Sequence, residues 1–491
     1  MLLELFQPSI MIPWLLGMVF GIFVGSTPGL TATMAVALIV PLSYHLPPAA
    51  GLAMIIGVSF TAIFAGDIPA TFLRIPGTPA SAAATLDGHA LARRGRGVFA
   101  LQLDLFCSAI GGLIGVTLLA LVAPQLARVA LKFSSYEYFW LGLMGLAMSA
   151  LVSQGGLLRG LTSAMLGLAL ATVGMDTSGT PRFSFGVIDL IERLEVIPVM
   201  IGLFGLAEVL RSLSGSALHG QAAQLEQTKV TLGEVLGTIW RRRTTVATSS
   251  LVGTVIGALP GAGADVAAWG AYGIAERMSN DEEEFGAGAI DGVVAPTSAN
   301  NAAVAGAWIP ALVFGVPGDA VTAIVLGALM VYNIKPGPQI FETSGPLVRQ
   351  LLLIAFITQL LLIPAGLVGL RAFQTILRLP RRHVLAGVLV FSVVGSYAIR
   401  SSLFDVYVMI AAGALGWFLE SQRVPLAPLV LGLILGNLVE ENLRKGLIGS
   451  DGDLTPFFTR PICVALIVAL VACLAAPLLR RLFSRSTRAA A

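Results

Sequence analysis

Long apolar stretches, separated by short polar ones, occupy most of the chain. Between Glu4 and Asp67 there is no Asp, Glu, Lys or Arg for 62 residues, and a membrane-spanning helix needs about 20 apolar residues. The same test identifies further stretches at 105–127, 138–158, 244–264, 292–318, 350–370 and 461–479. With shorter runs included, the pattern predicts an all-α polytopic membrane protein with about a dozen transmembrane or re-entrant segments.

Composition agrees with this pattern. Of the 491 residues, 56% are hydrophobic and only 12% are charged, against about 25% charged residues in soluble proteins. The net charge of +3 is too small to indicate a nucleic-acid partner. The three cysteines and four histidines lack metal-ligand spacing, and the motifs GxxxxGK[ST], HExxH and GxSxG are absent. We therefore expect no enzyme activity, no cofactor and no metal centre apart from a coupling ion.

Basic residues concentrate in a few loops, and such loops stay cytoplasmic because Lys and Arg resist translocation. The clusters placed inside are Arg93, Arg94 and Arg96; Arg241, Arg242 and Arg243; Arg371, Arg378, Arg381 and Arg382; and Arg480, Arg481, Arg485 and Arg488. The N-terminus, 332–345 and 440–460 carry little or no excess of positive charge and are placed outside. This predicts an N-terminus outside, a cytoplasmic C-terminus and an odd number of crossings.

Pro and Gly punctuate two parts of the chain in the same order. Residues 21–29 match 253–261 at an offset of 232 (28 to 260), and residues 68–77 match 309–318 at an offset of 241 (69 to 310). A third match pairs Pro198 and Gly202 with Pro428 and Gly432. These matches indicate an internal duplication.

The two copies differ in the charge that follows them. The first continues into the triple-Arg loop, whereas the second continues into the nearly neutral loop at 332–345. We therefore predict two inverted-topology repeats with Pro-Gly-broken helices, the usual construction of secondary transporters. The predicted parts are a first repeat at 1–213, a cytoplasmic amphipathic linker at 214–243 and a second repeat at 244–491.

Pro-Gly pairs interrupt apolar segments at matched positions of the two halves: Pro28-Gly29, Pro76-Gly77, Pro260-Gly261 and Pro317-Gly318. Such a break is tolerated in a membrane only where the backbone is buried in protein or lines a cavity. Helix N-terminal amides attract anions and free carbonyls attract cations, so the breaks predict a binding site near the midplane. A plain kink or loop end is the alternative at each one.

Polar side chains near these breaks extend the predicted site. The substrate-binding set comprises the four Pro-Gly pairs with Thr31, Arg74, Thr78, Ser81, Asn300 and Asn301. The cation-coupling set comprises Asp67, Asp265, Asn301, Asp319 and Thr322. Ionisable groups inside apolar segments are costly and by default functional. The alternatives are helix packing for the hydroxyls and amides, and solvation at an interface for Asp67, Arg74 and Asp319.

Several motifs together resemble a known family. They are the run FGAGAIDGVVAP at 285–296, then 299–302 with Asn300 and Asn301, 309–318, Lys335 to Pro338, and in the first half 75–81, 86–88 and 92–95. This combination resembles the large membrane subunit of the tripartite tricarboxylate transporters, the TctA type. The Pro-Gly breaks, Thr78, Asn300 and Asn301 are the positions that match the family pattern.

The resemblance implies a multi-pass subunit of the bacterial inner membrane, in which the outer side predicted from loop charge for the N-terminus would be the periplasm. It also implies two protein partners, a small membrane subunit of the TctB type and a periplasmic solute-binding protein of the TctC type. Such an assembly takes up small organic anions, carboxylates such as citrate, driven by a gradient of Na⁺ or H⁺. Family members commonly have Glu where this chain has Thr297 and Ser where it has Asp319. Many of them also have Gly-Gly-Ser near 65–67 and Asn near Arg74.

The leading interpretation is a permease subunit of a binding-protein-dependent secondary transporter for an organic di- or tricarboxylate. A passive anion channel and a divergent transporter for a non-carboxylate solute are the alternatives, and a homodimer is left open. One acid is missing at Thr297 while another is present at Asp319. We therefore hypothesise that Asp319 takes part in cation coupling.

Overall fold

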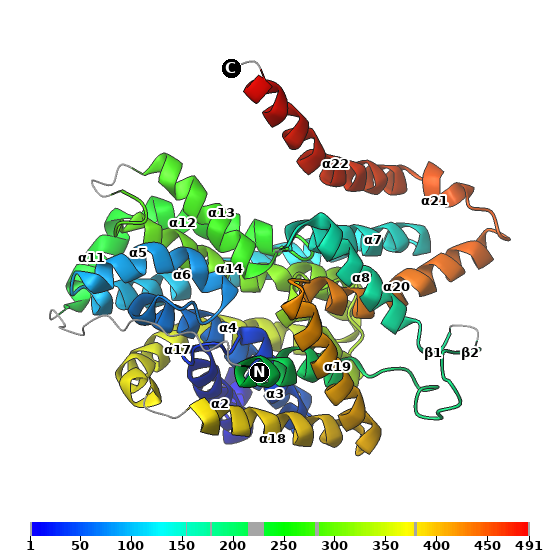
Figure 1. Cartoon of the computed structure of the whole chain (residues 1–491), viewed down its shortest axis with the longest axis horizontal. Coiled ribbons are helices and arrows are strands. Elements are labelled where there is room, and N and C mark those ends of the chain that lie inside the picture. The colour runs from blue at the N-terminus through cyan, green and yellow to red at the C-terminus, as the bar shows by residue number, and fades with distance from the viewer. Residues whose placement is uncertain are drawn as a thin grey trace. The chain divides into compact units, whose positions relative to one another are not determined.

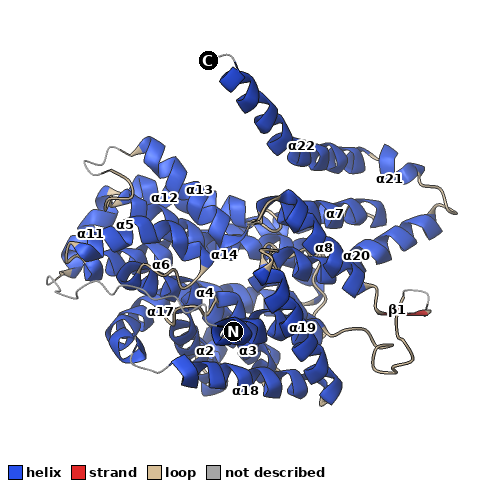
Figure 2. Cartoon of the chain, viewed as in Figure 1, coloured by secondary structure: helices blue, strands red, loops and turns tan. Residues whose placement is uncertain are grey.

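The computed structural model describes most of the chain and is almost entirely helical (Figure 2). The described residues are 2–153, 155–176, 179–214, 230–279, 284–377 and 381–489. Arg378 of the predicted cytoplasmic clusters and residues 215–229 of the predicted linker lie outside them. The prediction of an all-α polytopic membrane protein is confirmed.

Seven described helices are long and apolar enough to cross a membrane. They contain the spans Pro8–Gly25, Pro48–Leu73, Gly97–Ala130, Val196–Leu213, Gly345–Phe373, Arg382–Arg400 and Leu403–Ser421. Shorter apolar helices cover Ala32–Ser43, Leu157–Ala171, Ala320–Val331 and Pro461–Ala475. Together they come close to the number of segments that the hydropathy pattern predicts.

The chain divides into two compact units, of which the first contains residues 1–127 and 195–418. Its N-terminal helices are α1 (Leu2–Leu5), α2 (Pro8–Gly25), α3 (Ala32–Ser43), α4 (Pro48–Leu73), the 3₁₀ turn η1 (Pro79–Ser81), α5 (Ala82–Arg93) and α6 (Gly97–Ala130). Next come α9 (Val196–Met200), the π-helical turn η2 (Ile201–Leu206), α10 (Ala207–Leu213), α11 (Leu232–Arg241), α12 (Arg243–Gly257), α13 (Gly263–Met278) and α14 (Asp291–Phe314). The unit ends with α15 (Ala320–Val331), α16 (Ile340–Thr343), α17 (Gly345–Leu377), α18 (Arg381–Arg400) and α19 (Leu403–Ser421).

The second unit contains residues 128–194 and 419–491. Its elements are α7 (Ser135–Val152), α8 (Leu157–Ala171), the strands β1 (Gly174–Met175) and β2 (Pro181–Arg182), α20 (Ala427–Gly449), α21 (Thr455–Thr459) and α22 (Pro461–Ala489). The two strands pair antiparallel, and α20 packs against α7 and α8. Each unit thus takes segments from both predicted repeats, whose boundaries and inverted topology stay predictions.

Two buried helices form the centre of the first unit. In α4 every residue from Ala50 to Thr71 is buried, and in α14 the same holds from Asp291 to Val313. Helix α4 packs against α2, α3 and α17, whereas α14 packs against α12, α13 and α5, and the two helices contact each other (Figure 1). Of the predicted site residues, Asp67 lies on α4, and Asn300 and Asn301 lie on α14.

Candidate functional site

Small residues bring the backbones of neighbouring helices into direct contact in both halves. A Cβ atom on Gly21 of α2 would lie 2.8 Å from the carbonyl oxygen of Val58 in α4. A Cβ atom on Gly253 of α12 would lie 2.3 Å from the carbonyl oxygen of Ala299 in α14. Glycines four residues apart permit this close approach, as in the small-xxx-small packing of membrane helices. Each central helix is therefore held by a partner from its own predicted repeat.

The Pro76-Gly77 break follows directly on the end of α4. Arg74 caps this helix in the left-handed conformation, with φ of 56°, and its side chain is exposed, as is Pro76. The backbone N–H of Gly77 donates to the carbonyl oxygen of Gly66 at 3.0 Å. The break therefore folds back onto α4 instead of leading the chain away from it.

The Pro317-Gly318 break repeats this arrangement at the end of α14. Gly315 caps α14 in the left-handed conformation, with φ of 69°. The carbonyl oxygen of Gly318 accepts a hydrogen bond of 2.7 Å from the N–H of Gly261, so the third and fourth breaks are joined. Within the second half, two distant Pro-Gly pairs thus form one structural feature.

The second and fourth breaks make the same backbone contacts, and the contacted residues are related by the offsets of 232 and 241 found in the sequence. A Cβ atom on Gly77 would lie 2.5 Å from the carbonyl oxygen of residue 25 and 2.7 Å from Cα of residue 66. A Cβ atom on Gly318 would lie 2.7 Å from the carbonyl oxygen of residue 257 and 2.7 Å from Cα of residue 307. Residues 25 and 257 differ by 232, and residues 66 and 307 differ by 241, as do 77 and 318. The local geometry therefore follows the duplication seen in the sequence.

Hydroxyl and carboxyl groups pair after the second and fourth breaks. The side-chain oxygens of Thr78 and Ser81 lie 2.8 Å apart, and both side chains are buried. At the matching positions, Oδ1 of Asp319 accepts hydrogen bonds from Oγ1 of Thr322 at 2.7 Å and from its N–H at 2.8 Å. Asp319 is thus the N-cap of α15, and Asp265 lies near enough to interact with it electrostatically.

The first and third breaks also separate two helices each. Pro28 and Gly29 lie between α2 and α3, and Thr31 is the N-cap of α3, accepting from the N–H of Met34 at 3.2 Å. Pro260 and Gly261 lie between α12 and α13. All four Pro-Gly pairs therefore interrupt helices.

A polar cluster lies in the core of the first unit, where α4, α6 and α14 meet. Nδ2 of Asn300 donates to Oδ2 of Asp67 at 3.3 Å, and the carboxyl groups of Asp67 and Asp104 are within interaction distance of each other. Asp67 and Asp104 are 1% and 2% exposed, and Asn300 is fully buried. The hydroxyl of Ser81 also faces the Asp67 carboxyl group, which connects this cluster to the turn after the second break.

Asn301 bridges three helices beside this cluster. Its Nδ2 lies 3.1 Å from the carbonyl oxygen of Ser108 in α6 and 3.4 Å from Oε1 of Gln359 in α17. The hydroxyl of Ser108 lies 3.0 Å from Oδ1 of Asp104. The two bonds of Asn301 are interhelical contacts of the kind that amides commonly make in membrane proteins, whereas the Ser108–Asp104 bond lies within α6. Asn301 therefore helps hold α6 and α17 against α14, the helix that carries Asn300.

Several oxygens of the cluster lack partners. Oδ1 of Asp67, Oδ2 of Asp104 and Oδ1 of Asn300 accept no hydrogen bond within the described part of the chain, and all are buried. No described Lys, Arg or His forms an ion pair with either carboxylate. Buried polar groups are normally hydrogen-bonded, and each exception calls for an explanation.

The structure brings some predicted residues together and leaves others apart. Asp67, Asn300 and Ser81 belong to the polar cluster, while Asp265, Asp319 and Thr322 form a second group at the joined breaks of the second half. Arg74 ends α4 seven residues beyond Asp67, with its side chain exposed.

Asp104, Ser108 and Gln359 do not occur among the predicted site residues. The charge-free stretch in α6 begins at residue 105, so Asp104 counts as its polar flank, although α6 itself begins at Gly97. An acid inside an apolar helix is a functional signal, and the apolar residues on both sides of Asp104 carry that signal in the sequence.

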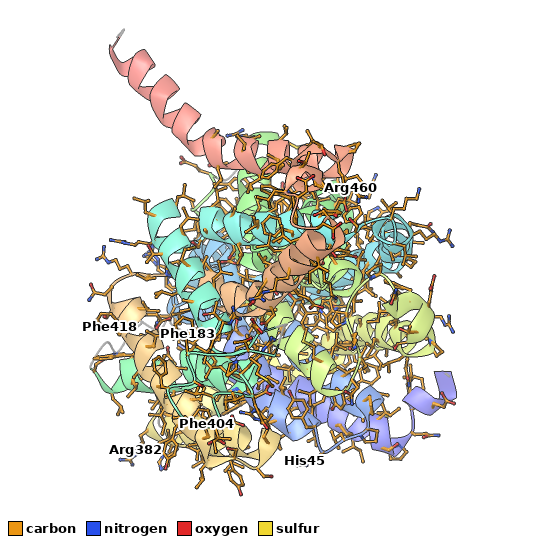
Figure 3. All side chains as sticks on the ribbon, turned by 90° about the vertical axis from the view of Figure 1, so that its right-hand side faces the viewer. His45, Phe183, Arg382, Phe404, Phe418 and Arg460 are labelled. Atoms are coloured by element: carbon orange, nitrogen blue, oxygen red, sulfur yellow. The ribbon has the colours of Figure 1, made fainter. Side chains whose placement is uncertain are left out.

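In the second unit, several acidic side chains form ion pairs with arginines. Arg460, labelled in Figure 3 near the start of α22, pairs with Glu137 at 2.7 Å. Arg182 pairs with Glu440 at 2.8 Å, and Arg444 with Asp176 at 2.9 Å. Each of these acids has a basic partner, which sets them apart from Asp67 and Asp104. None of the predicted site residues lies in this unit.

Comparisons with known proteins relate this sequence to a family of transporters. A family model described as "Tripartite tricarboxylate transporter TctA family" matches residues 11–431. An uncharacterized 52.8 kDa protein in the TAR-I ttuC′ 3′ region of Agrobacterium vitis is 35% identical over 474 residues, which cover 96% of this chain and 93% of that protein.

A second relative from Agrobacterium vitis, an uncharacterized protein in the TAR-II ttuC′ 3′ region, is 36% identical over 233 residues. The match covers 48% of this chain and 96% of that protein. No solved structure matches the chain.

Proposed function

The chain belongs to the tripartite tricarboxylate transporter TctA family, and from this premise we propose that it is the permease subunit of a binding-protein-dependent secondary transporter. It takes up an organic di- or tricarboxylate, driven by a gradient of Na⁺ or H⁺. It acts in the bacterial inner membrane with a small membrane subunit, a periplasmic solute-binding protein and no cofactor. Its N-terminus is periplasmic and its C-terminus cytoplasmic.

The observation that carries this proposal is the pairing of helix breaks with a buried polar cluster. Gly77 of the second break is bonded to Gly66, and the next residue, Asp67, belongs to the cluster. Secondary transporters bind substrate and coupling ions at discontinuous helices near the membrane midplane. The same combination in the core of the first unit supports a transport site.

The proposed substrate site comprises the backbone at the breaks, the hydroxyls of Thr78 and Ser81, and Arg74. An anion needs donors, which the amides beside Gly77 and Gly318 and the Arg74 guanidinium supply. The carboxyl and amide groups of the cluster instead supply oxygen ligands, which suit a cation. Anion and cation would thus occupy neighbouring but distinct positions.

A co-purification experiment tests the substrate class. The periplasmic protein that co-purifies with the tagged chain is isolated under native conditions, and its bound small molecule is identified by mass spectrometry. Uptake of that molecule by cells is then measured with Na⁺ and with choline as the replacement cation. A bound di- or tricarboxylate whose uptake needs this chain supports the proposal. A neutral or cationic ligand, or uptake that persists when the chain is deleted, contradicts it.

A further inference from the structure

We infer that Asp67 of α4, Asp104 of α6 and Asn300 of α14 form a binding site for a single Na⁺ ion, the coupling cation of the transporter. This inference rests on the proposed function for the role of the ion, but the site itself follows from the arrangement of the three side chains. All three are buried, and they come from three different helices. The site therefore exists only when α4, α6 and α14 are packed together.

Charge is the first argument for a bound cation. Two neighbouring carboxylates in a protein core cost several kcal/mol each unless they are compensated. Asp67 and Asp104 have no basic partner among the described residues, in contrast to Asp405, which pairs with Arg400 at 2.5 Å. A positive charge supplied from outside the chain would remove this imbalance.

The donor set is the second argument, and it favours a metal ion over a proton. A proton shared by the two carboxyl groups would connect one oxygen of each but would leave Oδ1 of Asn300 without a partner. A hard cation binds several oxygens at once, and carboxylate and amide oxygens are the ligands such cations prefer. The three unpartnered oxygens Oδ1 of Asp67, Oδ2 of Asp104 and Oδ1 of Asn300 are ligands of this kind.

The second pair of neighbouring acids, Asp265 and Asp319, has no such unpartnered oxygens in the described part of the chain. Oδ1 of Asp319 already accepts two hydrogen bonds from Thr322, and neither Asp319 nor Asp265 has an unpartnered buried oxygen in the described part of the chain. Asp319 is thus satisfied as a helix cap, whereas Asp67 and Asp104 are not satisfied by the protein alone. The unpartnered oxygens therefore assign the ion to the cluster of α4, α6 and α14.

Backbone contacts connect this site to the second helix break. Asp67 follows Gly66, whose carbonyl oxygen accepts from the N–H of Gly77 at 3.0 Å. A Cβ atom on Gly66 would lie 2.9 Å from Oγ of Ser81, so the turn after the break packs directly on α4. An ion that fixes Asp67 would therefore also fix the break at which we place the anion.

Direct Na⁺ binding to the full-length chain tests the inference. The purified protein in detergent is titrated with ²²Na⁺ by scintillation proximity, with choline chloride keeping the ionic strength constant. We expect saturable binding by the wild type and at least about tenfold weaker binding by Asp67→Asn and by Asp104→Asn, because each loses one charged ligand. Asp451→Asn is the matched control, since Asp451 is exposed and has φ of 51°, a conformation that Asn adopts readily.

Thermal unfolding gives a second readout that a merely structural role would not produce. Na⁺ should raise the unfolding midpoint of the wild type but not of the two Asp variants. In choline, each Asp variant should be at least as stable as the wild type, because one of two uncompensated buried charges is gone. If an Asp variant does not fold, Asn300→Ala, which keeps both carboxylates, should still bind Na⁺ more weakly than the wild type.

Two outcomes would overturn the inference: no saturable ²²Na⁺ binding by the wild type, or wild-type affinity in Asp104→Asn. Neither measurement uses substrate or partner proteins. A failure here therefore leaves the proposed uptake of an organic anion open, and a failure of uptake leaves the Na⁺ site open.

Discussion

Arg74 ends α4 with an unusual backbone for an arginine. Its φ of 56° lies in the left-handed region, and its side chain is exposed two residues before the Pro76-Gly77 break. Left-handed residues other than Gly, Asn and Asp are uncommon and call for a reason. Arg423 shares this conformation, with φ of 59°, so the role proposed for Arg74 rests on its position beside the break.

Replacing Arg74 with Lys tests this role without changing the backbone requirement. Lys keeps the positive charge but cannot pair with a carboxylate in the bidentate manner of a guanidinium. We expect uptake to fall roughly tenfold at unchanged expression, since hydrogen bonds between charged groups contribute about 1.5–3 kcal/mol. The matched control is Arg423→Lys, because Arg423 is also exposed and has φ of 59°. Normal uptake by Arg74→Lys would show that the guanidinium of Arg74 does not contribute to substrate binding.

Replacing Asp319 tests the hypothesis from the sequence that this acid takes part in cation coupling. Asn is as good an N-cap as Asp, so Asp319→Asn keeps α15 capped while removing the charge. The hypothesis from the sequence predicts that gradient-driven accumulation falls more than exchange of preloaded substrate, whereas an ion held by Asp67 and Asp104 predicts that the two change equally. Proteoliposomes permit both measurements on one preparation.

Asp453→Asn is a suitable control for this experiment. Its Oδ1 accepts from the N–H of Thr455 at 2.8 Å and from the hydroxyl at 2.6 Å, much as Asp319 does from Thr322. Asp453 is exposed and lies in the second unit. Equal loss of accumulation and exchange in Asp319→Asn, or loss of neither, would remove Asp319 from the coupling site.

Among the elements, the contacts of α12 with α14 and of α2 with α4 decide whether the breaks are held in place. The glycines at these contacts leave no room for a side chain, because the facing backbone is too close. Since Gly77 packs on residue 25 and Gly318 on residue 257, both at the ends of these helices, looser packing would also displace the breaks.

Gly253→Val therefore should destabilise the protein. A valine there would collide with the backbone of Ala299, and overpacking of this kind costs about 1–3 kcal/mol. The thermal unfolding midpoint in detergent should drop accordingly. Gly273→Val in α13 is the control, because nothing lies within 4 Å of a Cβ atom at Gly273. Equal midpoints for the two variants would show that the close α12–α14 contact does not stabilise the fold.

The elements around the site were largely predictable from the sequence, and the tertiary cluster was not. Pro-Gly pairs end helices by local chemistry, so all four breaks were found where the structure has them. Asp104 belongs to the cluster through contacts with Asp67, 37 residues away in the chain, and Gln359 through contact with Asn301, 58 residues away. Hydropathy along the chain does not report such contacts between helices.

At the scale of the whole molecule, the orientation of the two repeats is the main untested prediction. The loop with Arg93 should be cytoplasmic and the loop at 332–345 periplasmic, because positive charge is retained inside. Gly95 and Gly337 mark these loops but have φ of 75° and 141°, so cysteines there would strain the backbone. Arg93 and Gln339 are exposed neighbours better suited to labelling.

Single cysteines at these positions decide the question. Arg93→Cys and Gln339→Cys are made in a background in which Cys107, Cys463 and Cys473 are replaced by Ala, and whole cells are treated with an impermeant thiol reagent. We expect Gln339→Cys to label from the periplasm and Arg93→Cys to label only after the inner membrane is permeabilised. Labelling of both from one side would exclude the inverted arrangement.

The division into two compact units adds a feature that the repeat does not explain. The predicted site residues all lie in the first unit, although both units contain acids that are paired with arginines. The proposed transport site therefore lies within the first unit.

Uptake into proteoliposomes tests the central claim most directly. The chain is reconstituted with the small membrane subunit, the ligand-loaded binding protein is added outside, and accumulation of the labelled anion is followed under inward Na⁺ and H⁺ gradients imposed separately. We expect one of these gradients to drive accumulation above the external concentration, and only when the binding protein is present. Simple equilibration of the anion, independent of gradient and binding protein, would indicate a passive channel and contradict the proposed secondary transport.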